Sequence, residues 1–241
     1  MGASYREPSL AAPGVTGQAQ APRRPRAVYR YGVVLLMLAA AMMVGILAPP
    51  SGWGRFSSIL LQLAAVSAAL SRAGVSRRLL GVTVAVGALA VGGGIADLLF
   101  GGRYALGITG LAEAALLGLV PVAIFAEFRR DLAVTLQSVM AALCIYLVFG
   151  MFFASLAYAV GALGGAPYFA GKTTADSSDY LYFSYITLAT VGYGDYVPAM
   201  GVARALAVLE ALTGQLYLVT VVALVVGNLA GRRPSGTSRQ G

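Results

Sequence analysis

Six long apolar runs follow one another along the chain, separated by short polar or glycine-rich gaps. They cover residues 31–48, 56–70, 79–100, 104–128, 132–163 and 202–230. An α-helix needs about 20 mostly apolar residues to cross the hydrocarbon core of a bilayer, and most of these runs approach or exceed that length. The run 56–70 is the shortest of the six. The pattern predicts an all-α membrane protein with six transmembrane helices.

The chain between the fifth and sixth runs has a different pattern. Residues 164–179 are largely polar, residues 179–189 form a short amphipathic run, and the string TVGYGD follows at 190–195. The short run cannot span a bilayer. We therefore expect a re-entrant helix followed by extended chain that returns to the same face. Such backbone is tolerated at membrane depth only where protein covers it or where it lines water. The candidate N-caps of this helix are Ser177, Ser178 and Asp179.

Composition points to lipid as the solvent and away from enzyme chemistry. Hydrophobic residues make up 59% of the 241 and charged residues 11%, whereas charged residues are roughly 25% of an ordinary soluble domain. There is no histidine, and Cys144 is the only cysteine. An intramolecular disulfide, a cysteine-based metal site and the usual neutral-pH acid–base group are thereby excluded. We expect no enzymatic activity and no organic cofactor.

The 17 basic residues lie at the chain ends and in the gaps between apolar runs. If the N-terminus is inside and all six runs cross, only four of them face the outside, and the other 13 face the inside, as cytoplasmic loops require. The four are Arg55, Arg103, Lys172 and Arg204. This predicts a multi-pass protein of the cell membrane with both termini cytoplasmic. Residues 1–27 would be a disordered tail and residues 232–241 a short tail; a cleaved signal peptide is the alternative near the N-terminus.

The string TVGYG at residues 190–194 suits the binding of a dehydrated monovalent cation. Successive backbone carbonyls can supply the oxygen ligands if the backbone alternates between left- and right-handed angles, and Gly192 and Gly194 reach positive φ at little cost. Val191 and Tyr193 would then point away from the ion and pack against the short helix, and the Thr190 hydroxyl would add an oxygen. One chain supplies one strip of carbonyls, so four copies around an axis are needed to replace a hydration shell.

TVGYGD resembles the selectivity filter of tetrameric potassium channels of the prokaryotic six-transmembrane type. The resemblance implies a homotetramer, with 132–163 as outer helix, 179–189 as pore helix and 202–230 as inner helix. Residues 131–231 would form the pore domain, and residues 28–130 a four-helix membrane domain similar to a voltage-sensor domain without its arginines. K⁺ would be the permeant ion. The implied filter residues are Thr190, Val191, Gly192, Tyr193 and Gly194, of which the first four would bind K⁺.

The family also implies how the filter is supported. An aromatic residue on the pore helix commonly bonds the aspartate that follows the filter. Tyr182 or Tyr185 could take this role toward Asp195, with Tyr182 nearer the expected position. Asp195 would also raise the cation concentration at the outer mouth. Some relatives carry a glutamate four residues before the first filter threonine, where this chain has Ile186, so the resemblance does not extend to filter behaviour that depends on that glutamate.

Four residues are candidates for gating. Gly214, near the middle of the last run, is either a hinge, as the resemblance implies, or a site of close helix packing. The adjacent Gln215 is expected to face the central cavity. Glu210 is expected to form a structural bond behind the filter. Glu113 is the one charge deep in the fourth run, and it is either a proton- or ligand-sensitive switch or the partner of a buried group such as a Tyr hydroxyl.

The fourth run lacks the chemistry of a voltage sensor. A voltage sensor needs several charges in the membrane field, but this run contains no Arg or Lys and Arg103 only precedes it. Asp97 and Arg103 flank the turn before it and are expected to form an exposed pair. Two arginine pairs at the inner surface either bind anionic lipid or serve as ordinary positive-inside anchors. These are Arg129, Arg130, Arg232 and Arg233.

The sequence thus predicts a potassium-selective channel subunit that conducts K⁺ passively and is not conventionally voltage-gated. One alternative is a potassium transporter or uptake pore, whose families carry four related pore loops in one chain, usually with a single filter glycine. This chain has one loop with both glycines, which argues against that alternative. The other alternative is a non-conducting modulatory membrane subunit, against which the intact TVGYGD argues.

Overall fold

The chain folds into helices throughout nearly all of the part that the structure describes. The computed structural model describes residues 30–47, 52–72, 77–128 and 136–231. The helices are α1 (Arg30–Leu47), α2 (Gly52–Arg72), α3 (Arg77–Phe100), α4 (Arg103–Phe128), α5 (Leu136–Leu163), α6 (Ser177–Leu188) and α7 (Gly201–Gly231). No β-strand forms in these ranges, and a single antiparallel bridge joins Phe169 and Pro198. The all-α class is confirmed.

Some of the expectations fall outside the described residues. They are the tails at 1–27 and 232–241 and the lipid-binding candidates Arg129, Arg130, Arg232 and Arg233.

Five of the described helices are long and apolar enough to cross a membrane, judged by length and composition alone. Their candidate spans are Trp53–Ser71, Gly81–Phe100, Arg103–Val122, Ser138–Leu163 and Gly201–Val221. The shortest run of the sequence lies within the 21-residue α2 and qualifies as a span. The stretch Tyr31–Leu47 of α1 is apolar but shorter. A multi-pass membrane protein is therefore supported, and the crossing by α1 stays a prediction.

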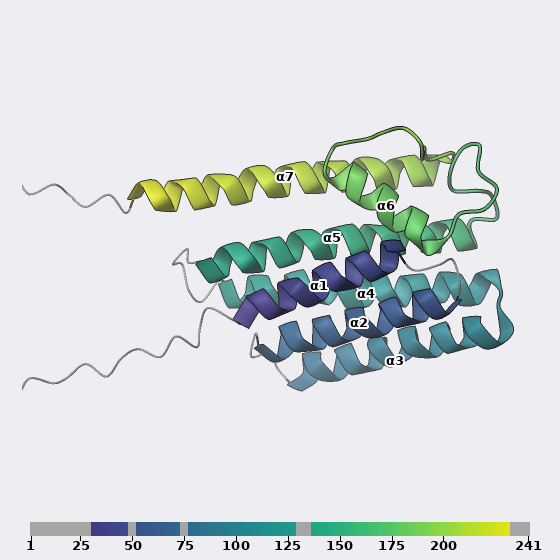
Figure 1. Ribbon diagram of the computed structural model, residues 1–241, viewed down its shortest axis with the longest axis horizontal. Helices are drawn as coiled ribbons and strands as arrows, with labels where there is room; N and C mark the ends of the chain where they lie inside the picture. Colours follow the sequence, from purple (N-terminus) through teal and green to yellow (C-terminus); the bar gives the residue numbers. More distant parts are fainter. Residues whose placement is uncertain (1–29, 48–51, 73–76, 129–135, 232–241) are drawn as a thin grey trace, which may run out of the picture.

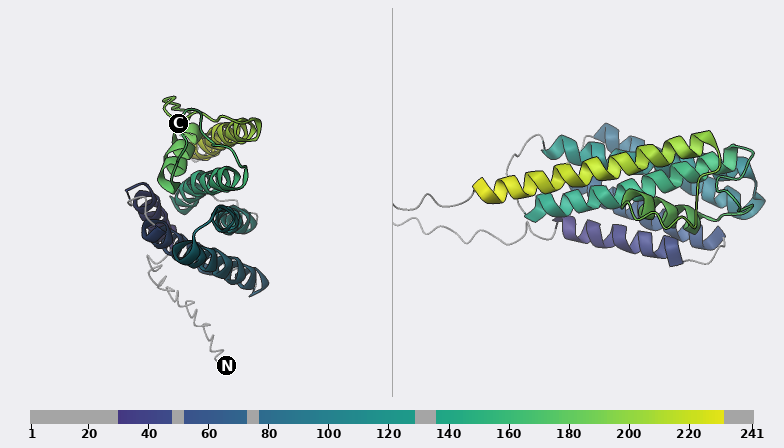
Figure 2. Two further views of the ribbon diagram at one scale, coloured as in Figure 1. Left: turned by 90° about the vertical axis from the view of Figure 1, so that its right-hand side faces the viewer. Right: turned by 90° about the horizontal axis from the view of Figure 1, so that it is seen from above.

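The helices form a flattened bundle with α5 in the middle (Figure 1). α4 and α1 pack against α5 from one side, and α6 and α7 pack against it from the other. The end-on view places α3 and α7 at opposite edges of the bundle (Figure 2). Of the first four helices, α1 and α4 therefore pack directly on α5 of their own chain, while α2 packs on α1 and α4, and α3 packs on α2 and α4.

The largest buried cluster joins α1, α2, α4 and α5. It contains Val34, Leu70, Leu117 and Cys144, which are inaccessible to solvent. In lipid, apolar side chains gain little by leaving the acyl chains for one another, so shape complementarity between helices holds such a bundle together. This cluster holds α1, α2 and α4 against α5.

The turn between α3 and α4 differs from its expected ion pairing. Gly101 and Gly102 make the turn with φ of +62° and +111°, angles that glycine adopts readily. Asp97 does not pair with Arg103 but lies 3.7 Å from the guanidinium of Arg55 on α2. Arg103 instead donates to the carbonyl of Leu163 at the end of α5. The expected exposed pair was wrong because Arg55, on the preceding helix α2, reaches the same carboxylate.

Candidate functional site

The short helix α6 lies at one end of the bundle, and the chain after it returns to that end before α7 begins (Figure 1). Its N-cap is Asp176, whose carboxylate accepts from the backbone of Ser178 and Asp179, while the Asp179 carboxylate accepts from the backbone N–H of Asp176. This reciprocal capping box satisfies donors that a helix start leaves open. The N-cap is therefore the residue just before the three expected candidates Ser177, Ser178 and Asp179. Asp179 takes the N3 position of the box instead.

The backbone of TVGYG alternates in handedness. Thr190, Gly192 and Gly194 have φ of +57°, +55° and +82°, whereas Val191 and Tyr193 have no positive φ. Aligned carbonyls require this alternation. Glycine occupies two of the three positions with positive φ. Thr190 is the only non-glycine residue with positive φ in the described ranges, so it carries a strain of about 1–3 kcal/mol that the surrounding contacts must hold.

The start of this segment is tied to the end of α6. The backbone N–H groups of Val191 and Gly192 both donate to the carbonyl of Ile186, at 2.8 and 3.1 Å, and that of Thr190 donates to Thr187 at 3.0 Å. By contrast, no described group donates a hydrogen bond to the backbone carbonyls of residues 190–194. The first three donors of the segment thus bond the end of α6, and its acceptors stay available.

The end of the segment is tied to the start of α6 and to the polar loop. The Tyr196 hydroxyl donates to the Asp179 carboxylate, which raises the pKa of Tyr196, and the Lys172 ammonium opposes part of that rise. Lys172 lies 3.3 Å from the centre of the Tyr196 ring. The N–H of Ala170 donates to the carbonyl of Val197 at 2.8 Å. Both ends of the TVGYG strip are therefore held by its own chain.

The two candidate tyrosines on α6 have different partners. The Tyr182 side chain interacts with the Asp195 carboxylate and packs edge-on against the Tyr196 ring. The Tyr185 hydroxyl instead donates to the carbonyl of Leu147 on α5, at 2.7 Å. The structure thus brings Tyr182 to Asp195 and uses Tyr185 to join α6 to α5.

The side chains of the strip do not pack as expected within one chain. Val191 is 50% exposed and Tyr193 is 73% exposed, although both were expected to pack against α6. A Cβ added at Gly192 or Gly194 would meet nothing within 4 Å. The expected packing was wrong for the single chain because the described residues supply no surface on the far side of the strip.

Glu210 lies behind α6 in a polar link between three helices. Its side chain is 1% exposed and contacts the Ser184 hydroxyl of α6, which lies 2.6 Å from the carbonyl of Gly150 on α5. A hydroxyl has one hydrogen and a carbonyl only accepts. Both bonds form together when Glu210 is protonated and donates to Ser184, which then donates to Gly150. This is the structural bond behind the strip that the sequence suggested.

Gly214 is a position of close helix packing. A Cβ there would collide with the backbone carbonyl oxygen of Leu188, at the C-terminal end of α6. The adjacent Gln215 side chain is exposed in the single chain. Because Gly214 has no side chain, α7 passes directly behind the end of α6, where the TVGYG strip begins.

Glu113 lies apart from the strip, where α4 meets α5. It is 8% exposed and accepts from the Ser155 hydroxyl at 3.3 Å. Its partner is therefore a serine and not a tyrosine. Sequence reasoning missed Ser155, Ser184 and Tyr196, because nothing in their local pattern distinguishes a hydroxyl that joins two helices from one that bonds its own backbone.

Comparison with known families adds one finding. Residues 141–230 match a family model described as "Ion channel", and this range covers most of α5, all of α6 with the TVGYGD segment, and nearly all of α7. No curated protein and no solved structure matches the chain. The match supports an ion-channel domain in the second half of the chain and a channel rather than an enzyme.

The close approach at Gly214 generates a first prediction. Gly214→Ala is expected to destabilise the folded protein by about 1–3 kcal/mol, because the methyl group must displace the end of α6. Gly227→Ala is the matched control on the same helix, since a Cβ there would meet nothing within 4 Å; it should be neutral or stabilising by up to about 1 kcal/mol. Thermal melting of the purified protein compares the two. A Gly214→Ala variant that melts no lower than Gly227→Ala contradicts the packing argument.

The link through Ser184 generates a second prediction. Glu210→Ala should destabilise the protein by roughly 1–3 kcal/mol, because it leaves a buried hydroxyl with one bond fewer and a cavity beside it. Glu210→Gln should retain most of the stability, because its amide can donate to Ser184 as the protonated carboxyl does. Melting curves of both variants and of Ser184→Ala check this. Equal losses in the Ala and Gln variants would show that a charged carboxylate, not a neutral donor, is what the site needs.

Proposed function

We propose that the protein is a potassium-selective channel subunit that assembles as a homotetramer and conducts K⁺ passively. The observation that carries this proposal is the backbone of residues 190–194. Its φ angles alternate in sign, and its carbonyls accept no hydrogen bond from any described group. A strip of free, aligned carbonyl oxygens is the ligand set that replaces the water around K⁺ in a selectivity filter. Thr190, Val191, Gly192 and Tyr193 would bind the ion.

The proposed fourfold assembly rests on the groups that a single chain leaves without a partner or a packing surface. A single strip cannot surround an ion, and the exposed Val191 and Tyr193 side chains need a surface to pack on. Among the described helices of its own chain, α7 packs mainly against α5 and α6. Its outer face carries large exposed apolar residues, among them Leu209, Leu212 and Leu216. Four copies around an axis would cover the strip and line a central pathway with α7.

Electrostatics favours a cation in that pathway. The C-terminal end of α6 precedes Thr190, and the C-terminus of a helix carries partial negative charge. Asp195 follows the strip and would raise the cation concentration at the outer mouth. α4 holds no basic residue after Arg103, which supports a channel without conventional voltage gating.

Localisation and lipid contacts follow from charge alone. We place the protein in the cell membrane with both termini in the cytoplasm, because this arrangement puts most of the arginines on the inner side. Arg129, Arg130, Arg232 and Arg233 would lie at that surface, where anionic lipid could bind them. Gln215 would face the cavity below the filter.

A flux measurement tests the conducting role. The full-length protein reconstituted in liposomes should give a K⁺-driven flux that ignores Na⁺ and is blocked by Ba²⁺, and the purified particle should show fourfold symmetry. Saturating flux coupled to a second ion indicates a transporter. No flux from a correctly folded tetramer indicates a modulatory subunit. A monomer or dimer contradicts the proposal directly.

A glycine pair generates the third prediction. Gly192→Ala should abolish selective K⁺ flux. A residue with a side chain disfavours the left-handed angle by about 1–2 kcal/mol, so the backbone at this position would change and its carbonyl would point elsewhere. Gly171→Ala is the matched control: Gly171 has φ of +72° and open space around its Cβ position, as Gly192 does, but it lies in the outer loop. The control should keep its flux and selectivity. Equal loss in both variants would point to general misfolding.

A further inference from the structure

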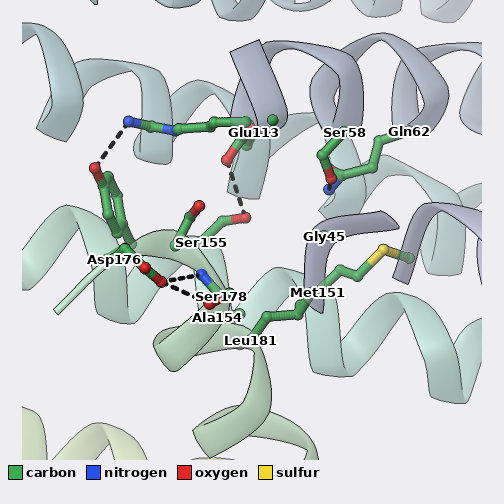
Figure 3. A pocket seen from close by; sticks show the side chains of 14 residues that line it. Gly45, Ser58, Gln62, Glu113, Met151, Ala154, Ser155, Asp176, Ser178 and Leu181 are labelled. Atoms are coloured by element: carbon green, nitrogen blue, oxygen red, sulfur yellow. Dashed lines mark hydrogen bonds between the residues drawn. The ribbon is translucent and has the colours of Figure 1, made fainter. Parts of the chain in front are cut away.

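A polar cavity lies between the four-helix domain and the second half of the chain. It is bounded by α1, α2, α4 and α5 and by the start of α6, where Ser177 and Ser178 line it. Figure 3 shows the labelled Glu113, Ser58 and Gln62 side chains along one side and Ser155 along the other. About 40 Å³ is open to the centres of water-sized atoms, which is roughly room for three water molecules.

One polar atom in this cavity has no partner. The Gln62 side chain is 6% exposed, and its Nε2 donates to the Ser58 hydroxyl at 3.3 Å. Its Oε1 accepts no hydrogen bond from any group in the described residues. A buried amide oxygen without a partner costs about 1–3 kcal/mol. The cavity therefore presents a free oxygen ligand.

Among the described residues that line the cavity, Arg55 is the one cation, and it is already bonded to other groups. The Arg55 guanidinium pairs with Asp97 and donates to the Tyr158 hydroxyl at 2.9 Å and to the Leu106 carbonyl at 3.4 Å. No Arg or Lys nitrogen within the described parts of the chain lies within 4 Å of the Glu113 carboxylate. Glu113 is buried with one hydroxyl contact, from Ser155. Arg55 therefore acts on the Glu113 carboxylate only from beyond ion-pair distance, and this carboxylate forms no ion pair with a described residue.

We propose that this cavity binds a small monovalent cation of the Na⁺ class, held by the Glu113 carboxylate, the Gln62 amide oxygen and the hydroxyl oxygens of Ser58 and Ser155. Two carboxylates line the cavity, and that of Asp176 is engaged in the capping box of α6. The Glu113 carboxylate with neutral oxygens balances a single positive charge, whereas Ca²⁺ sites supply six to eight oxygens, commonly with several carboxylates. Protonation of Glu113 would remove its charge but would leave the Gln62 oxygen unpartnered. A cation with one or two waters satisfies both groups and fits the volume.

The site also has a structural consequence. The bound ion would lie between α2, α4 and α5, and the cavity reaches the first residues of α6. The bound ion would join the four-helix domain to α6, the helix that leads into the TVGYG strip. This inference goes beyond the proposed conduction path, since neither Glu113 nor Gln62 touches residues 190–194.

Thermal melting of the full chain in lipid nanodiscs tests the site. The K⁺ concentration is held constant so that the occupancy of the TVGYG strip by K⁺ does not change. Na⁺ replaces N-methyl-D-glucamine at constant ionic strength. The melting temperature should rise with Na⁺ and saturate. Glu113→Gln and Gln62→Leu should each raise the half-saturating Na⁺ concentration roughly tenfold or more, the usual effect of losing a group that holds a metal ion. Ser71→Ala, an exposed position at the other end of α2, should titrate like the native protein.

Direct binding of radioactive Na⁺ to the native tetramer in the same K⁺ buffer gives a second measurement, which does not require the variants to fold. Saturable binding supports the site. Absence of both binding and a Na⁺-dependent rise overturns it, and so does an unchanged midpoint in both variants. A stability change that follows pH instead of Na⁺ and disappears in Glu113→Gln assigns the cavity to a proton and also overturns it. None of these readouts needs conduction, so a failed flux experiment leaves the result intact.

Discussion

A backbone carbonyl at membrane depth must find a hydrogen-bond donor, water or an ion, because the hydrocarbon offers none. Residues 190–194 place five consecutive carbonyls where no described group of the chain donates to them, while the amides at the start of the same strip are bonded to the end of α6. At its start the segment is therefore satisfied on its donor side, whereas its carbonyls accept no hydrogen bond from the described groups. This asymmetry is the constraint on which the proposed ion pathway and the proposed fourfold assembly both depend.

The rest of the second half serves to hold that strip in place. The capping box at Asp176 and Asp179 fixes the start of α6, and the Tyr196 hydroxyl ties the far end of the strip to the same Asp179. Behind the strip, Ser184 connects α6 to both α5 and α7. Because Gly214 has no side chain, the α7 backbone approaches the end of α6 closely. These contacts offset the strain at Thr190, the one position in the strip where a residue with a side chain takes a left-handed angle.

The four-helix domain is organised by a different balance of forces. Apolar packing joins it to α5, but its polar groups converge on one cavity. Arg55 pairs with Asp97 outside the cavity lining, whereas the oxygen atoms of Glu113 and Gln62 remain available as ligands. α4, which lacks a row of arginines, supplies a single acid to this cavity. The acid on α4 and the amide oxygen on α2 are the groups on which the proposed cation site depends.

The sequence by itself determined the all-helical class, the long apolar helices, the short helix before TVGYGD and the positions of Gly192 and Gly194, because hydrophobic periodicity and glycine are local properties of the chain. It pointed to Glu210 and Glu113 because an acid in an apolar run is conspicuous. Only the tertiary structure decided their partners, the pairing of Asp97 with Arg55, the exact cap of α6 and the left-handed angle at Thr190. The partners of the two acids and the Asp97–Arg55 pair depend on which side chains meet across different helices, which neither apolar periodicity nor residue spacing encodes. The cap of α6 and the angle at Thr190 depend on backbone geometry within a few residues, where Asp176 and Asp179 bond each other's backbone and Thr190 bonds the carbonyl of Thr187.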